Sequence, residues 1–265
     1  MTFHGFPGPA GKLARMNRSR LLAFFLPLLA ASLPLRAQDP FEVQVYEYET
    51  VPKGRWNLET HLNYVSKGTT EYEGPMAPTE GQFHTTLELT HGITDNFELA
   101  GYVLLGSYTG GSFQYAGARI RPRVMVPKEW EWPVGVSLSV EIGFPPKVFE
   151  ENGTTLEIRP IFEKKFGAWQ LDINPVVGTA LSGPGKGEWD FEPGVRFAYE
   201  ASKALDLSIE YYGAIPFSEG DQVHQIYPGA DIHFSPDVVL NVGAGWGLTD
   251  AGNRFVWKMR VGVLF

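Results

Sequence analysis

Apolar and polar residues alternate along most of the chain. In the stretch 254–261 the apolar residues are Phe255, Trp257, Met259 and Val261, and the residues between them include Arg254, Lys258 and Arg260. A period of two places the two sets on opposite faces of a β-strand. The pattern recurs at 118–126, 156–162, 171–177 and 205–211, and it predicts strands rather than helices.

Turn-forming residues divide the chain into segments of similar length, each of roughly 10 to 14 residues. We expect about twelve strands, near 55–66, 82–93, 97–108, 113–126, 133–144, 154–166, 168–181, 188–200, 204–215, 222–234, 237–248 and 253–265. The connections alternate in length, because those at 94–96, 166–168, 201–203 and 235–237 are short and those at 67–81, 145–153 and 216–221 are longer. Short turns at one end and long loops at the other are typical of an up-and-down antiparallel transmembrane β-barrel. The connection 127–133 is longer than its position predicts.

The direction of the apolar face decides the class of protein. A soluble sandwich or a lipocalin-like barrel turns this face inward, whereas an outer-membrane barrel turns it toward lipid. Aromatic residues near the expected strand ends favour the membrane barrel, because Tyr and Trp gather at membrane interfaces. These residues are Trp56, Tyr64, Tyr108, Trp169, Trp189, Tyr199, Trp246 and Trp257. Prolines within the strands, where proline is unusual, are explained by neither architecture; they are Pro122, Pro160, Pro175 and Pro193.

The chain stops in Val261-Gly262-Val263-Leu264-Phe265, which resembles the terminal strand of bacterial outer-membrane proteins. That resemblance implies that Phe265 is an assembly signal for the barrel assembly machinery. Residues 54–60 (GRWNLET) and 89–99 (LTHGITDNFEL) resemble the MetA-pathway phenol-degradation family of outer-membrane proteins. This second resemblance implies a twelve-stranded barrel and the passage of small organic molecules, and it leaves the substrate open.

The first 37 residues carry five basic side chains and no acidic one. An apolar run over 21–35 follows the basic residues, and the small residue Ala37 precedes the expected cleavage point. We therefore expect residues 1–37 to be a secretory signal peptide, with Met16 as an alternative start. A membrane anchor is the competing interpretation, although two prolines interrupt a run that is short for a spanning helix. Cleavage leaves 17 basic and 30 acidic side chains, a formal charge of −13.

Residues 38–54 are acidic and only weakly strand-like. We expect them to form a periplasmic segment or to enter the lumen as a plug. The barrel itself is expected over 55–265.

Both signs of charge fall on the face that an outer-membrane barrel turns inward. The expected lumen-lining residues are Glu59, His61, Glu88, Arg119, Arg121, Arg123, Glu141, Glu157, Arg159, Asp172, Arg196, Glu210, Asp231, Lys258 and Arg260. In one interpretation the row of Arg119, Arg121 and Arg123 attracts anions or orients a polar solute, because rings of charge set selectivity. In the other, the inward residues pair with one another and fill the lumen. A barrel of about twelve strands lies between the filled small barrels and the open porins.

Other classes of protein fit the sequence poorly. The chain has no cysteine, which excludes a disulfide scaffold, a thiolate metal site and a cysteine nucleophile. Its acidity argues against nucleic acid as a partner. The glycine-rich stretches 183–187 and 243–247 fail the phosphate-loop and dinucleotide patterns, and no nucleophile elbow is present. His61 and His84 are expected to face inward without metal-binding spacing, so we expect no metal and no cofactor.

The sequence therefore predicts a channel or transporter for small solutes, organic ones included, in the bacterial outer membrane. A lipid-modifying outer-membrane enzyme and a closed structural or adhesive barrel are the alternatives. No Ser–His pair stands out, so we expect no enzyme. The expected partners are outer-membrane lipid, the barrel assembly machinery and an unidentified small solute.

Overall fold

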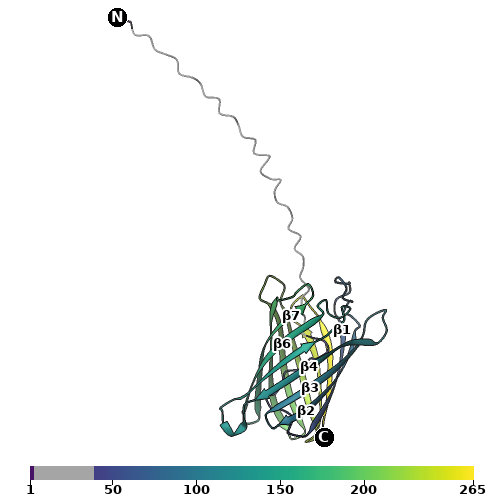
Figure 1. The fold of residues 1–265 in the computed structure, drawn as a ribbon, viewed down its shortest axis with the longest axis vertical. Helices are drawn as coiled ribbons and strands as arrows, with labels where there is room; N and C mark the ends of the chain where they lie inside the picture. The colour runs from purple at the N-terminus through teal and green to yellow at the C-terminus, as the bar shows by residue number, and fades with distance from the viewer. Residues whose placement is uncertain (3–38) are drawn as a thin grey trace. The chain divides into compact units, whose positions relative to one another are not determined.

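The computed structural model describes residues 1–2 and 39–265, so the expected signal peptide falls almost wholly outside the described residues. From residue 39 onward the chain builds a closed antiparallel barrel in which each strand pairs with the next and β12 pairs with β1 (Figure 1). The strands of this described part are β1 (Trp56–Lys67), β2 (Phe83–Thr94), β3 (Phe97–Ser107), β4 (Gln114–Met125), β5 (Gly135–Gly143), β6 (Thr154–Phe166), β7 (Trp169–Ser182), β8 (Trp189–Ser202), β9 (Leu205–Pro216), β10 (Val223–Ser235), β11 (Val238–Gly247) and β12 (Phe255–Leu264).

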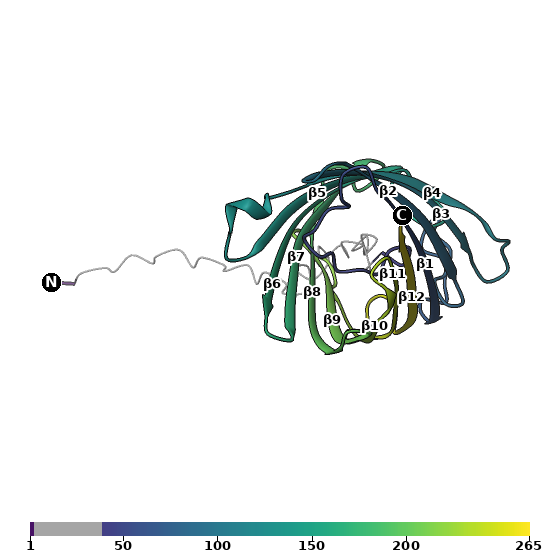
Figure 2. The ribbon, with the colours of Figure 1, turned by 90° about the horizontal axis from the view of Figure 1, so that it is seen from below.

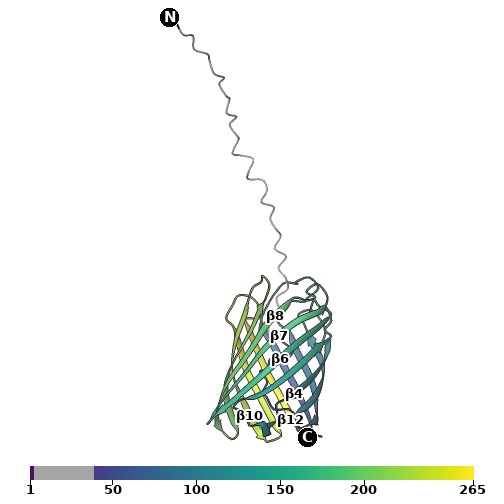
Figure 3. The same cartoon turned by 60° about the vertical axis from the view of Figure 1, so that its left-hand side comes forward.

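The twelve-stranded up-and-down barrel predicted from the alternation is confirmed. Every strand begins and ends within two residues of its expected range. The strands follow one another around the wall in chain order, as β6, β7 and β8 do side by side in Figure 3. Short connections favour this order, because two consecutive strands joined by a short link pair most simply as antiparallel neighbours.

The apolar face of the barrel points outward. Leu87 and Leu89 on β2 are exposed, whereas Thr86 and Glu88 between them are buried. The same inversion holds on β9, where Ile209 is exposed and Glu210 is buried. A wall with apolar residues outside and polar residues inside belongs in lipid, which excludes the soluble sandwich and the lipocalin-like barrel.

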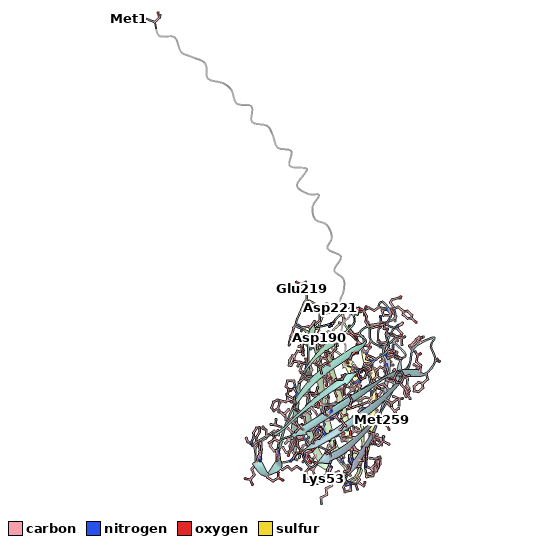
Figure 4. All side chains as sticks on the ribbon, in the orientation of Figure 1. Met1, Lys53, Asp190, Glu219, Asp221 and Met259 are labelled. Atoms are coloured by element: carbon pink, nitrogen blue, oxygen red, sulfur yellow. The ribbon has the colours of Figure 1, made fainter. Side chains whose placement is uncertain are left out.

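The two ends of the barrel differ, as the connection lengths predict. Residues 95–96 and 203–204 form tight links at one end of the barrel. Lys53 lies at this same end, whereas Glu219 and Asp221 lie at the opposite, long-loop end (Figure 4). The exceptional connection after β4 belongs to the short-turn end and contains the 3-10 turn η2 (Lys128–Trp130). There the exposed rings of Trp130 and Trp132 lie 6.0 Å apart, which suits a membrane interface.

Among the described residues, no helix has the length and apolar character needed to cross a membrane.

The strand prolines lie where the hydrogen-bonded ladder is interrupted. Between β6 and β7 the register breaks off after residue 158 and resumes at 162, and Pro160 and Pro175 fall in this gap. Similar gaps between β4 and β5 and between β8 and β9 hold Pro122 and Pro193. Because proline has no N–H, it leaves no unpaired donor where the ladder opens. The prolines that the sequence pattern left unexplained thus lie at gaps in the hydrogen-bonded ladder of the closed barrel.

Candidate functional site: the filled lumen

Residues 39–54 cross the inside of the barrel without joining its sheet (Figure 2). Asp39 lies among residues of the long loops, and at the other end the Gly54 N–H donates to the carbonyl of Gly92, near the tight link between β2 and β3. We call residues 39–54 the inserted segment.

Side chains of the barrel wall hold the backbone of the inserted segment. Asn174 on β7 accepts from the Tyr46 N–H at 2.7 Å and donates to the Tyr46 carbonyl at 3.0 Å. Arg123 donates to the carbonyls of Glu47 and Glu49 at 3.0 and 2.7 Å. Buried backbone groups need partners, and here wall side chains replace a neighbouring strand. Further bonds of this kind are Asn63 to the Pro40 carbonyl, Thr86 to the Phe41 carbonyl, Lys258 to the Val43 carbonyl, and the Val51 N–H to Glu98.

Apolar side chains of the inserted segment pack against two small clusters inside the barrel. Val43 and Val45 form one cluster with Val65, Tyr212, Tyr227 and Val256. Phe41 forms the other with Ala100, Tyr102, Leu104 and Ala116, and Phe149 packs against it. Burial of these groups adds a hydrophobic contribution to the polar contacts that hold the segment.

The arginine row faces inward, and carboxylates neutralise it. The nitrogen–oxygen pairs are Arg119 with Asp39, with Glu42 at 3.2 Å and with Glu141 at 3.0 Å, Arg121 with Glu88 at 2.5 Å and with Glu98 at 3.2 Å, and Arg123 with Glu98 at 2.8 Å. The inserted segment supplies Asp39 and Glu42, so its charge joins the network of the wall. Of the two interpretations left open by the sequence, this geometry favours pairing.

The remaining cations of the lumen are paired in the same way. Their closest contacts are Arg196 with Asp231 at 2.6 Å and with Asp172 at 3.0 Å, Lys258 with Glu210 at 2.5 Å, Arg260 with Glu59 at 2.7 Å, and Arg159 with Glu157 at 2.7 Å. Among the described residues, the buried set holds nine carboxylates and only five Lys or Arg side chains. Acidic side chains therefore outnumber basic ones among the buried groups of the lumen.

Tyr46 lies at the centre of this network. The guanidinium carbons of Arg159 and Arg121 lie 4.5 and 4.6 Å from the centre of its ring, a cation–π arrangement. Its hydroxyl donates to Glu42 and lies 3.1 Å from the Tyr102 hydroxyl. One side chain of the inserted segment thus contacts cations from two different strands.

All fifteen expected residues are buried or half-buried on the inward face of the strands. All but Arg123 form an ion pair with another member of the set, and Arg123 pairs with Glu98 instead. Sequence reasoning missed Glu98, Asn174 and Tyr46. Glu98 is fully buried and stands between the outward Phe97 and Leu99, so the alternation on β3 identifies it. Asn174 lies on the polar face of β7 by the same rule. No pattern in 38–54 marks Tyr46.

A cavity of about 220 Å³ opens at the long-loop end. Phe41 and Phe149 line one side with their ring centres 5.4 Å apart, and the fully buried ring of His84 packs 4.4 Å from that of Phe41 without lining the cavity. Partial burial, together with the nearby Glu151 carboxylate, raises the pKa of Glu73. The charged residues that line the cavity are Asp39, Glu71, Glu73, Glu141, Glu150, Glu157, Glu192 and Arg119.

One group of side chains has the composition of a metal site. Glu59, His61 and Glu88 are buried, and one potential ligand atom of each lies within 4.8 Å of the others. The spacing along the sequence did not reveal this group, because Glu88 comes from a different strand.

A closed barrel with an apolar outer face and a charged, filled lumen is the architecture of outer-membrane β-barrel proteins. Among solved structures, the chain is similar to the COG4313 outer membrane channel from Pseudomonas putida F1, with a TM-score of 0.62 and 13% identity over 84% of this chain and 100% of that one. It is also similar to the KdgM porin and to the NanC porin. Both have a TM-score of 0.53 and cover 79% of this chain and 98% of theirs, at 8% and 10% identity.

At these identities the likeness shows the fold, which is that of bacterial outer-membrane barrels. The sequence matches no protein-family model and no curated protein.

Proposed function

We propose that this protein is an outer-membrane channel for small solutes whose passage the inserted segment controls. The observation that carries the proposal is the way in which this segment is held. It contributes no strand to the wall, and its backbone is bonded largely to side chains. The segment can therefore shift without breaking the hydrogen-bonded ladder that closes the barrel.

The charge of the cavity supports selectivity for cationic or neutral solutes. Seven carboxylates and one guanidinium line it, and that guanidinium, of Arg119, is already paired with carboxylates. Negative charges that line a pore repel anions and concentrate cations. We therefore propose cation preference instead of the anion attraction that the arginine row suggests by itself.

The aromatic side chains at the cavity support an organic solute. The rings of Phe41 and Phe149 line the cavity next to the carboxylates, and such mixed surfaces bind small molecules with an apolar body. The resemblance of residues 54–60 and 89–99 to the phenol-degradation family points to the same class of solute. We propose small aromatic or other apolar organic molecules, neutral or positively charged, and no catalytic activity.

Planar bilayers test the proposal. The folded mature protein is expected to give a small conductance whose reversal potential in a KCl gradient shows preference for K⁺. A variant that lacks residues 39–53 is expected to conduct more strongly. Folded protein without conductance or solute flux in either form would exclude a channel.

A further inference from the structure

Glu59, His61 and Glu88 meet because of the strand geometry. Glu59 and His61 are two residues apart on β1 and share its inner face, and Glu88 on β2 is directly paired with Glu59. Carboxylates placed directly opposite one another on neighbouring strands repel. The inward face thus holds two close negative charges with an imidazole beside them.

Each of the two carboxylates binds an arginine with one oxygen and directs the other oxygen toward His61. The Oε1 of Glu59 accepts from Arg260 at 2.7 Å, and the Oε1 of Glu88 accepts from Arg121 at 2.5 Å. The second oxygens remain near His61, whose Nε2 lies 3.5 Å from Glu59 Oε2 and 3.8 Å from Glu88 Oε2. The outer partners fix the carboxylates in the orientation that this requires.

Two of the inner atoms are buried without a hydrogen-bond partner. His61 is 1% exposed and Glu88 is 2% exposed, and neither His61 Nε2 nor Glu88 Oε2 makes a hydrogen bond. Buried polar atoms of this kind call for a partner. The amide of Gln44, oriented to accept from Arg260, donates to Glu59 Oε2 at 3.3 Å and leaves the other two atoms as they are.

The separations fit a shared cation. Two ligands bound to one tetrahedral zinc at about 2.1 Å lie about 3.4 Å apart, close to the 3.5 and 3.8 Å found here. Among the described residues, nine buried carboxylates stand against five buried Lys and Arg side chains, an acidic excess that a bound cation offsets. The half-buried Arg119 and Arg260 do not close this difference.

We propose that Glu59, His61 and Glu88 bind one divalent transition-metal cation of the Zn²⁺ class. His61 Nε2, Glu59 Oε2 and Glu88 Oε2 are the protein ligands, a nitrogen and oxygen set that Zn²⁺ accepts. The ion ties β1 to β2 beside the β1–β12 seam. It relieves the repulsion between the paired carboxylates and is independent of solute passage.

Metal analysis of a tag-free mature protein tests the site. The protein is incubated with Zn²⁺, separated from free ion by gel filtration in detergent, and assayed by mass spectrometry of the metal. We expect about one Zn²⁺ per chain for the wild type and at most a tenth of that for His61→Gln. His84→Gln is the matched control, because His84 on β2 is a second buried histidine of the lumen and lies outside the group. The His84→Gln protein is expected to retain the ion.

Spectroscopy covers the case in which His61→Gln fails to fold, a defect that heat-modifiable gel migration detects. Co²⁺ added to the wild type is expected to give the intense visible bands of a tetrahedral site, and one equivalent of Zn²⁺ is expected to abolish them. Wild-type protein without bound Zn²⁺, or equal Zn²⁺ content in His61→Gln, would overturn the proposal. His61 would then be an imidazolium between two carboxylates.

Discussion

Asn174 and Tyr46 are 128 positions apart in the chain, yet they exchange two hydrogen bonds inside the barrel. The amide of Asn174 accepts from the Tyr46 N–H and donates to the Tyr46 carbonyl, as a neighbouring strand does in a sheet. This contact fixes the middle of the inserted segment to the wall with one side chain.

Replacement of this side chain is expected to loosen the inserted segment. Asn174→Ala leaves two buried backbone groups of Tyr46 without partners, which costs about 2 kcal/mol. The expected results are a higher conductance in planar bilayers and faster proteolysis within 39–54. Asn241→Ala is the matched control, because Asn241 is a buried lumen asparagine that bonds to Asp231. Equal conductance in both variants would show that the contact does not hold the segment.

The ring of Tyr46 and its hydroxyl have separable effects. Tyr46→Phe keeps the ring beside Arg121 and Arg159 and loses only the hydroxyl contacts. Tyr46→Leu loses the cation–π contacts as well, which costs about 1 kcal/mol more. Conductance is expected to rise from wild type to Phe to Leu, and a Leu variant that matches the Phe variant would contradict the role of the ring.

The carboxylates at the mouth are expected to determine ion preference. Glu71→Gln together with Glu73→Gln removes two exposed negative charges from the cavity lining, and the preference for K⁺ over Cl⁻ in the reversal potential is expected to fall. Glu129→Gln with Glu131→Gln removes the same charge at the short-turn end and is the control. Equal shifts of the reversal potential in the two double variants would contradict a selective role of Glu71 and Glu73.

We propose that Phe265 acts in assembly rather than in stability. Its backbone exchanges hydrogen bonds with Trp56 at 2.8 Å, and its side chain is 59% exposed. Phe265→Ala therefore keeps the backbone closure and is expected to change the unfolding free energy of the refolded barrel by less than about 0.5 kcal/mol. The amount of folded protein in outer membranes of cells is expected to fall several-fold. Normal cellular assembly of this variant would remove the proposed signal.

Alternation along the strands was sufficient to predict the barrel and its polar interior. Residues such as Leu89 and Glu88 differ only in the face that they occupy, and a period of two assigns that face directly. The pairing of Arg121 with Glu88 was not predictable in the same way, because it depends on the register between strands and on rotamers. Tyr46 and Glu47 lie in a segment without periodicity, so their partners on the wall appear only in three dimensions.

The meeting of Glu59, His61 and Glu88 illustrates the same limit. The i, i+2 spacing of Glu59 and His61 is common in strands and has little meaning by itself. Only the register that pairs Glu59 with Glu88 completes the group. The prolines were visible in the sequence, but their explanation required the breaks in the ladder.

An engineered disulfide between the inserted segment and the wall tests whether residues 39–54 control the lumen. The chain has no cysteine, and a Cβ atom at Gly194 on β8 lies 3.3 Å from Cγ2 of Val45. In the double variant Val45→Cys, Gly194→Cys, we expect the disulfide to form in the folded barrel, and we expect conductance to be low when it is oxidised and to rise on reduction. Thiols that stay free to alkylation in the folded protein, or a conductance unchanged by reduction, would contradict a lumen controlled by residues 39–54.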